Sequence, residues 1–322
     1  MLADLDVDQR RAVTTESRLV AVIAGAGSGK TRVLTRRVAY RVATGSADAA
    51  HTVVLTFTRE AAGELRRRLP RLGLTERVTA GTFHSIAQQL LRQRWIDLDE
   101  RPRTIVTDRR RIVREISGPE SLDELVAELD WASARGVGPA AYEAAVRRGD
   151  RRAVVPVDRV TEAMAAYRRE KRQRGVVDLD DLLALTVEAM ASDSEFAAAT
   201  RWRYRHVLVD EAQDLNPLQH RLVDLLRDGN DDLFMVGDPA QAIYGFNGSD
   251  PAILREVSDR FPGIEVVRLP VNHRCTPQIV QVGAQALRAV DHDDEIESAR
   301  PDGPLVEVVR HDDEVHAVAA QH

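Results

Sequence analysis

The chain has 322 residues, a hydrophobic share of 43% and a formal net charge of −6, which fits a folded protein of two or three domains. A single cysteine, Cys275, excludes an internal disulfide and is typical of a reducing cytosol, and one cysteine with nine scattered histidines gives no zinc-site spacing. The acidic start lacks the apolar core of a secretory signal and no apolar run approaches the ~20 residues of a membrane span, so we expect a cytoplasmic protein without membrane contact.

Apolar runs near the beginning of the chain predict buried strands at residues 19–24, 52–57 and 78–81, with amphipathic helices between them. Strands that alternate with helices form parallel sheets covered by helices on both faces. The sequence therefore predicts an α/β fold, the first part of which covers residues 1–106.

A glycine-rich turn joins the first predicted strand to a helix expected at residues 31–42. Its Lys30 is one of only two lysines in a chain that otherwise uses arginine, which favours a compact ammonium placed between nucleotide phosphates. The backbone N–H groups of such a turn, and of the helix after it, point at an anion. The strict pattern has glycine at position 24, and an ordinary glycine-rich turn is the alternative. The candidate nucleotide-binding residues are Ala24, Gly25, Ala26, Gly27, Ser28, Gly29, Lys30, Thr31 and Arg32.

Residues 107–200 show helical patterns, and we predict no strand among them. The expected helices span residues 108–116, 121–135, 139–148, 157–172 and 179–191. Strand patterns return at 206–209, 232–236 and 264–269, which indicates one α/β domain, resumed at residues 201–275 after a helical insertion. Residues 276–322, with a helix at 278–290 and a strand at 304–309, indicate the start of a further, incomplete α/β unit.

Two carboxylates, Asp210 and Glu211, end the strand predicted just before them. Beside a phosphate loop, Asp210 and the Thr31 hydroxyl can hold Mg²⁺, and Glu211 can orient and deprotonate an attacking water. A solvated strand end is the alternative, and it would be the better interpretation without the lysine loop. Together the two segments predict an NTPase.

Arginine clusters lie at residues 66–68, 109–111, 147–152, 168–174 and 201–205. Each is more typical of a solvated helix face than of a DNA contact. The negative net charge does not exclude nucleic acid, because local patches matter more than the sum.

Seven segments resemble, in order, the motifs of the UvrD/Rep/PcrA-like DNA helicases of superfamily 1, and the resemblance covers residues 5–322. Any one segment can arise by chance, whereas the series is specific. It implies a P-loop (RecA-like) ATP-binding domain formed by residues 1–106 and 201–275, and a second RecA-like domain that begins at residue 276. The segments are residues 5–13, 56–62, 80–85, 177–183, 210–214, 236–246 and 271–277.

For the nucleotide, the resemblance implies that Gln9 reads the adenine edge, Gln241 contacts the γ-phosphate and Arg274 stabilises charge in the transition state. His273 stands where the family usually has a tyrosine stacked on adenine, and an imidazole offers less stacking area. ATP and Mg²⁺ are the implied cofactors. The implied catalytic set is Lys30, Asp210, Glu211, Gln241 and Arg274.

For DNA, the resemblance implies contacts from Phe57, from Thr82 and His84 through backbone phosphates, and from Tyr244 and Phe246 through base stacking. Burial in the core is the alternative for the three aromatic residues, because aromatic side chains are usually buried. Asn247 stands where the family usually has arginine, so one cation near the DNA or the phosphates is missing.

The resemblance implies ATP-driven 3′→5′ movement on single-stranded DNA and DNA junctions, with unwinding, in DNA repair or recombination. Later motifs of the second motor domain, including another γ-phosphate arginine, are not among these residues. We therefore expect this chain alone to bind ATP and DNA and to unwind poorly. A non-unwinding ATP- and DNA-binding module, as in a truncated paralogue, and the motor part of a helicase–nuclease are the alternatives.

Overall fold

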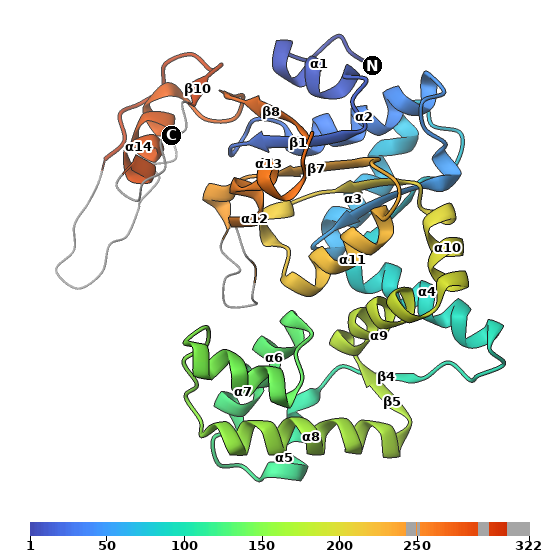
Figure 1. The fold of residues 1–322 in the computed structure, drawn as a ribbon. Coiled ribbons are helices and arrows are strands. Elements are labelled where there is room, and N and C mark those ends of the chain that lie inside the picture. Colours follow the sequence, from blue (N-terminus) through green and yellow to red (C-terminus); the bar gives the residue numbers. More distant parts are fainter. Residues whose placement is uncertain (243–248, 250–251, 289–295, 308–322) are drawn as a thin grey trace.

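The computed structural model describes residues 1–242, 249, 252–288 and 296–307. Figure 1 shows a sheet domain, a helical insertion below it and a C-terminal segment at one side. None of the described helices is both long enough and apolar enough to cross a membrane.

A six-stranded sheet with the order β3-β2-β6-β7-β1-β8 forms the centre of the sheet domain, and every neighbouring pair is parallel. The carboxyl ends of parallel strands meet at one edge, so the loops after β1, β6 and β7 lie next to one another there. The strands are β1 (Leu19–Ala24), β2 (Thr52–Thr56), β3 (Thr79–Thr82), β6 (His206–Val209), β7 (Leu233–Gly237) and β8 (Glu265–Leu269).

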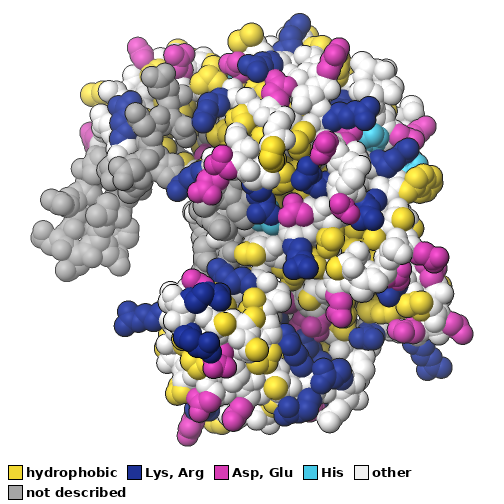
Figure 2. All heavy atoms as spheres, viewed as in Figure 1, with side chains coloured by type: hydrophobic (Ala, Val, Ile, Leu, Met, Phe, Trp, Pro, Cys, Tyr) yellow, Lys and Arg dark blue, Asp and Glu magenta, His cyan; other side chains and the backbone are white. Residues whose placement is uncertain are grey.

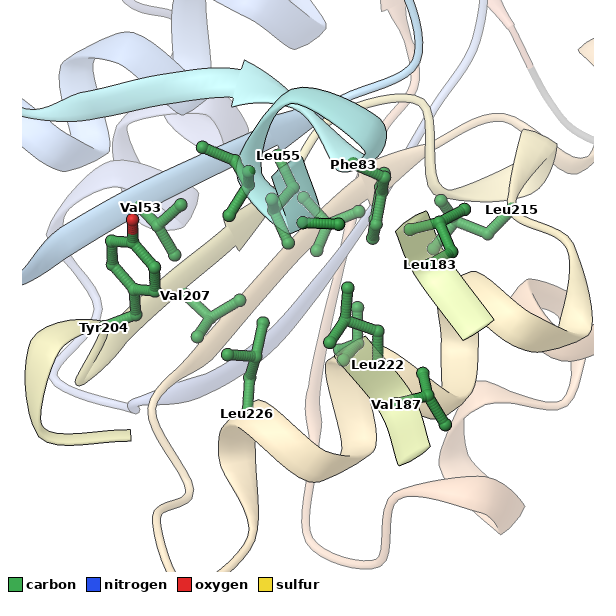
Figure 3. Packing of buried hydrophobic residues seen from close by; sticks show 14 of the residues in the cluster. Val53, Leu55, Phe83, Leu183, Val187, Tyr204, Val207, Leu215, Leu222 and Leu226 are labelled. Carbon is green, nitrogen blue, oxygen red and sulfur yellow. The ribbon is translucent and has the colours of Figure 1, made fainter. Parts of the chain in front are cut away.

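Helices cover both faces of this sheet (Figure 1). Alternate strand residues point to opposite faces; Val54 packs in the core under α1, α2 and α3, whereas Val53 and Leu55 pack in the core against α4, α9 and α11. In Figure 3 Leu183 and Leu222 lie in this second core together with Leu55. The helices are α1 (Val7–Thr14), α2 (Lys30–Ala43), α3 (Arg59–Arg71), α4 (Phe83–Asp97), α9 (Leu179–Ser192), α10 (Ser194–Arg203), α11 (Pro217–Arg227), α12 (Ala252–Arg255) and α13 (Val257–Arg260).

This architecture confirms the predicted α/β fold class. The strands predicted at 19–24 and 206–209 match β1 and β6. The strands predicted at 52–57 and 264–269 exceed β2 and β8 by one residue at one end, and those predicted at 78–81 and 232–236 lie one residue before β3 and β7 at both ends. The signal is strong for β1, β2, β6 and β7, because both faces of these strands are buried, which gives nearly continuous apolar runs.

The insertion has a hydrophobic core of its own, which includes Val113, Leu125, Tyr142 and Tyr167. Side chains of α9 and α10 pack instead in the core of the sheet domain. This packing favours an insertion that ends near Gly175, and we propose that boundary in place of residue 200. The helices of the insertion are α5 (Arg109–Ser117), α6 (Leu122–Arg135), α7 (Pro139–Arg148) and α8 (Val157–Arg174).

The expectation of no strand between residues 107 and 200 is wrong. A short strand, β5 (Val176–Asp178), pairs in parallel with β4 (Thr104–Val106), and the two form the base of the insertion. Three residues are too few to show an alternating pattern, and the partner strand lies far away in the sequence, so no local signal marks the pair.

The C-terminal segment contains α14 (Pro277–Arg288) and a second parallel pair, β9 (Val271–Asn272) with β10 (Glu297–Ser298). The helix predicted at 278–290 is confirmed over its described residues. The strand predicted at 304–309 is wrong for residues 304–307, which have no regular structure, and residues 308 and 309 lie outside the described part.

Candidate nucleotide-binding site

A cavity of about 520 Å³ opens at the carboxyl edge of the sheet, beside the turn between β1 and α2. It joins segments from both ends of the sequence, because β1 lies between β7 and β8 in the sheet. The residues that line it are Gly25, Ala26, Gly27, Gly29, Lys30, Thr31, Arg32, Arg68, Glu211, Gln241, His273 and Arg274.

The phosphate loop has the backbone geometry that its glycines predict. Gly27 and Gly29 have φ values of 74° and 92°, which favour glycine. A Cβ on Gly27 would lie 2.7 Å from Asn272 Oδ1, and one on Gly29 would lie 2.9 Å from Gln9 Nε2. Helix α2 begins at Lys30 and no side chain caps it, so its first N–H groups are available to an anion.

The ammonium of Lys30 lies across this loop, where Nζ donates to the Ala24 carbonyl at 3.2 Å. Ser28 is buried, and its hydroxyl donates to the Gly25 carbonyl at 2.7 Å. Ala24 is the last residue of β1 and is fully buried. The loop is therefore held in shape by side chains of its own residues that donate to its backbone carbonyls, with Lys30 at its mouth.

Gln9 braces the loop from outside the cavity. Asp6 caps α1 by accepting from the Gln9 N–H, and the fully buried Gln9 side chain donates from Nε2 to the Ser28 carbonyl at 2.8 Å. Its Oε1 has no hydrogen-bond partner among the described residues. The buried amide therefore faces the loop, and Gln9 is not among the residues that line the cavity.

The segment after β8 closes the cavity. Asn272 donates from Nδ2 to the Ala26 carbonyl at 2.7 Å and accepts the N–H groups of Arg274 and Cys275 at Oδ1. The His273 N–H donates to the Gly27 carbonyl at 3.0 Å, and its ring Nε2 lies 2.8 Å from Asp6 Oδ2. Arg274 is exposed and lines the cavity.

Carboxylates gather behind the cavity, at the end of β6. Asp210 is 2% exposed; burial, then the neighbouring charge of Glu211, raises its pKa to about 7. Burial and Glu211 also raise the pKa of Asp214 to about 6, and the charge of Lys30 opposes both shifts. Lys30 and Asp210 therefore act on each other electrostatically across the site, although they lie far apart in the sequence.

These groups fit a divalent cation. Mg²⁺ takes oxygen donors alongside phosphates and water. The site offers two such donors: the buried Asp210 carboxylate, whose pKa is raised, and the Thr31 hydroxyl at the mouth of the loop. Among the described residues no group of three or more His, Cys, Asp or Glu side chains could hold a metal alone, so phosphate and water oxygens would complete the shell.

The residues predicted to contact DNA lie at the same edge of the sheet, after β2 and β3. Phe57 follows β2 and is half-buried; Thr82 ends β3 and accepts the Ser85 N–H, which caps α4. His84 is in the first turn of α4, and burial lowers its pKa although Asp180 and Asp178 oppose the shift. Tyr244, Phe246 and Asn247 lie outside the described residues.

Four residues of this site were not predicted from the sequence. Arg68 lines the cavity and forms an ion pair with Glu64. In the sequence it belongs to the arginine cluster at residues 66–68, which is typical of a solvated helix face. Asn272, Gln213 and Asp238 are buried and hold the surrounding segments, and no local pattern reveals their partners.

Comparison with known proteins identifies the family of the chain. A family model described as the UvrD/REP helicase N-terminal domain matches residues 5–262. The chain is similar to the ATP-dependent DNA helicase UvrD2 of Mycobacterium tuberculosis, with 35% identity over 98% of this chain and 48% of that protein. It is also similar to the ATP-dependent DNA helicase PcrA of Staphylococcus aureus, with 28% identity over 89% of this chain and 40% of that protein. The chain thus spans less than half the length of either relative.

Proposed function

Because this chain belongs to the UvrD/Rep helicase family, we propose that it is the ATP-binding part of an ATP-dependent DNA translocase. One observation carries the proposal: Lys30, Glu211, Gln241 and Arg274, from four distant segments, line a single cavity. Phosphoryl transfer requires positioned positive charge around the phosphates and a group that orients water.

Residues in and beside the cavity then have the following roles. Lys30 and the first N–H groups of α2 bind the terminal phosphates, and Arg274 stabilises the charge that develops on the γ-phosphate. Glu211 orients the attacking water and accepts its proton. Gln241 contacts the γ-phosphate, and Gln9 and His273 bind near the base.

Asp210 and Thr31 would hold Mg²⁺, which neutralises phosphate charge when bound. A bound cation would lower the pKa of Asp210 from about 7, because positive charge favours the ionised form of that buried carboxyl.

DNA would lie along the same edge of the sheet, on Phe57, Thr82 and His84, with Tyr244 and Phe246 as stacking residues. A hollow of about 1040 Å³ between the insertion and the sheet domain supports binding of a polyanion. Figure 2 shows dark blue side chains gathered between α8 and α9, over this hollow. Its lining includes two acidic residues, Asp181 and Glu188, and five arginines, Arg103, Arg135, Arg168, Arg172 and Arg221.

The finer assignments are also proposals: 3′→5′ movement on single-stranded DNA or junctions, a role in repair or recombination, and a cytoplasmic location. They rest on the family alone. We further propose that residues 276–322 begin a second RecA-like domain and that these 322 residues bind ATP and DNA but unwind poorly alone. An arginine that contacts the γ-phosphate from another domain is worth about 10³–10⁵ in rate.

ATP hydrolysis with and without single-stranded DNA tests the proposal, using the wild type, Lys30→Ala and Glu211→Gln. We expect DNA to stimulate turnover, Lys30→Ala to abolish ATP binding, and Glu211→Gln to bind ATP without turnover. Equal ATP affinity in all three proteins would contradict it. Nucleotide binding without any DNA-stimulated turnover would favour the non-unwinding module instead.

A further inference from the structure

Gln213 has no role in the function proposed above, yet it connects the end of β6 with the end of β7. It lies in the 3₁₀ turn η2 (Ala212–Asp214) after β6 and is 2% exposed. Its Nε2 donates to Glu211 Oε2 at 3.0 Å and to Asp214 Oδ2 at 3.3 Å, and its Oε1 accepts the Asp238 N–H at 2.9 Å. One amide therefore spans the carboxyl ends of two neighbouring strands, β6 and β7.

The other end of this connection reaches Gln241. Asp238 accepts Gln241 Nε2 at Oδ2, 2.5 Å away, and the Ala240 N–H at Oδ1, 3.0 Å away. A continuous hydrogen-bonded path therefore runs from Glu211 through Gln213 and Asp238 to Gln241. Glu211 and Gln241, at the two ends of the path, both line the nucleotide cavity.

The backbone is shaped for this path. A Cβ on Gly237 would lie 2.7 Å from Gln213 Oε1 and 3.1 Å from the Gln213 backbone nitrogen. The first contact is shorter than real Cβ contacts and the second is tighter than most, so a side chain at position 237 would displace the Gln213 amide or η2, and the close approach favours glycine there.

We propose that Gln213 is a positioning residue for ATP hydrolysis, which holds the Glu211 carboxylate and the turn that carries Gln241 as one unit. With Oε2 held by the Gln213 amide, the second Glu211 oxygen has a fixed place from which to orient water. A shift of the Gln241 turn then also moves the carboxylate. The inference rests on the proposed function. It explains how Gln241, which contacts the γ-phosphate, and Glu211, which orients water, keep a fixed position relative to each other.

Gln213→Met tests it, because methionine keeps the length and removes every strong hydrogen bond. We expect kcat of DNA-stimulated ATP hydrolysis to fall about 10- to 100-fold, as for the loss of a hydrogen bond to a charged group, with ATP affinity within about 3-fold of wild type. The matched control is Gln219→Met. Gln219 is equally buried, at 3%, but its side chain only completes the capping box of α11. We expect that variant to lower the melting temperature and leave kcat unchanged.

A double-mutant cycle separates positioning from a general loss of structure. If Gln213 acts through Glu211, adding Gln213→Met to Glu211→Gln lowers the residual single-turnover rate by less than about 2-fold. The same loss in both backgrounds, or a wild-type kcat in Gln213→Met, overturns the inference. Should Gln213→Met not fold, Gln213→Asn replaces it, because the shorter amide cannot span both partners and the same loss is expected.

Lys30→Ala distinguishes failure of this inference from failure of the proposed function. If Lys30→Ala abolishes turnover and Gln213→Met does not change it, only the positioning role is wrong. If Lys30→Ala leaves turnover intact, the proposed function fails, and the inference fails with it.

Discussion

At the scale of single residues, the nucleotide site is held together by buried polar side chains that bond to the phosphate loop. Gln9 donates to Ser28 and Asn272 donates to Ala26, so the loop is braced from both sides. Lys30 closes the loop on itself through the Ala24 carbonyl. The cost of burying Gln9 Nε2 and Asn272 Nδ2 is offset because each donates to a carbonyl of the loop.

Asp210 gives a prediction about pH. Its pKa in the folded protein is raised to about 7, from an unfolded value near 4. Its contribution to stability is therefore fully present below about pH 4, is lost as the pH rises, and stays absent above about pH 7. Asp210→Asn, which cannot ionise, should gain stability relative to wild type across this window, by at most about 4 kcal/mol at 1.36 kcal/mol per pKa unit.

Urea unfolding of both proteins between pH 4 and 8, without nucleotide and with a chelator, measures this difference. Asp214, with a pKa raised to about 6, is common to both proteins and cancels. A stability difference that does not change with pH would contradict the assignment of a strongly raised pKa to Asp210.

Single residues were predicted from the sequence where a local pattern defines them, and missed where it does not. Lys30, Thr31, Asp210 and Glu211 follow from strand, turn and helix patterns. The hydrogen bond from Asn272 to Ala26 joins residues 246 positions apart, and no local sequence pattern near either residue predicts it.

At the scale of elements, the turn between β1 and α2 depends on close approach by its neighbours. Gly27 shows this most clearly, because a Cβ there would meet both Asn272 Oδ1 at 2.7 Å and Arg274 Cβ at 2.8 Å. A side chain at this position would push the segment after β8 away from the cavity.

Gly27→Ala should therefore weaken ATP binding by at least about 10-fold, since it adds both backbone strain and a clash. The control is Gly45→Ala, where φ is 72° and nothing lies within 4 Å of an added Cβ. It should cost about 1 kcal/mol of stability and leave ATP affinity unchanged. Titration of both variants with ATP checks this, and equal affinities would show that the close packing is not needed.

The junction of α8 with β5 and α9 depends on the other lysine of the chain, Lys171. It is 8% exposed, and its ammonium lies 2.8 Å from Asp178 and 2.6 Å from Asp181. Lys171→Met removes the positive charge beside these carboxylates and should lower the free energy of unfolding by about 3 kcal/mol. This is the lower end of the range for a broken buried pair, because Arg109 still contacts Asp178.

The matched control is Arg174→Met. Arg174 lies on α8 like Lys171 but is more exposed, and its ion pairs are with Glu115 and Glu170, so its loss should change stability little. Chemical unfolding of the two variants gives the comparison. Equal destabilisation would mean that the junction does not depend on the buried pair.

Elements were predicted well where burial leaves a long pattern. The six strands of the main sheet and the helices of the insertion follow from hydrophobic periodicity. The pair β4 and β5 does not, because each strand has three residues and gains its stability from the other.

At the scale of the whole molecule, charge is distributed unevenly. The net charge is −6, yet five arginines from three helices and one loop line the hollow between the insertion and the sheet domain. The arginine clusters in the sequence do not reveal this, because Arg103, Arg168 and Arg221 meet only in the folded chain.

Charge reversal in this hollow should weaken binding of single-stranded DNA. Arg168→Glu and Arg172→Glu should each reduce affinity and lower the slope of log affinity against log salt by about 0.7 per lost phosphate contact. Arg147→Glu, on α7 and outside the hollow, is the control and should bind as the wild type does. Fluorescence anisotropy over a salt series measures both quantities, and unchanged slopes would exclude the hollow from the DNA path.

We propose that one nucleotide is bound between the phosphate loop and the acidic end of β6. A crystal structure of the protein with Mg²⁺ and a non-hydrolysable ATP analogue tests it most directly. We expect the terminal phosphates within hydrogen-bonding distance of Lys30 Nζ, with the metal between Thr31 and Asp210. Phosphates bound elsewhere, for example in the hollow lined by Arg168 and Arg172, would contradict it.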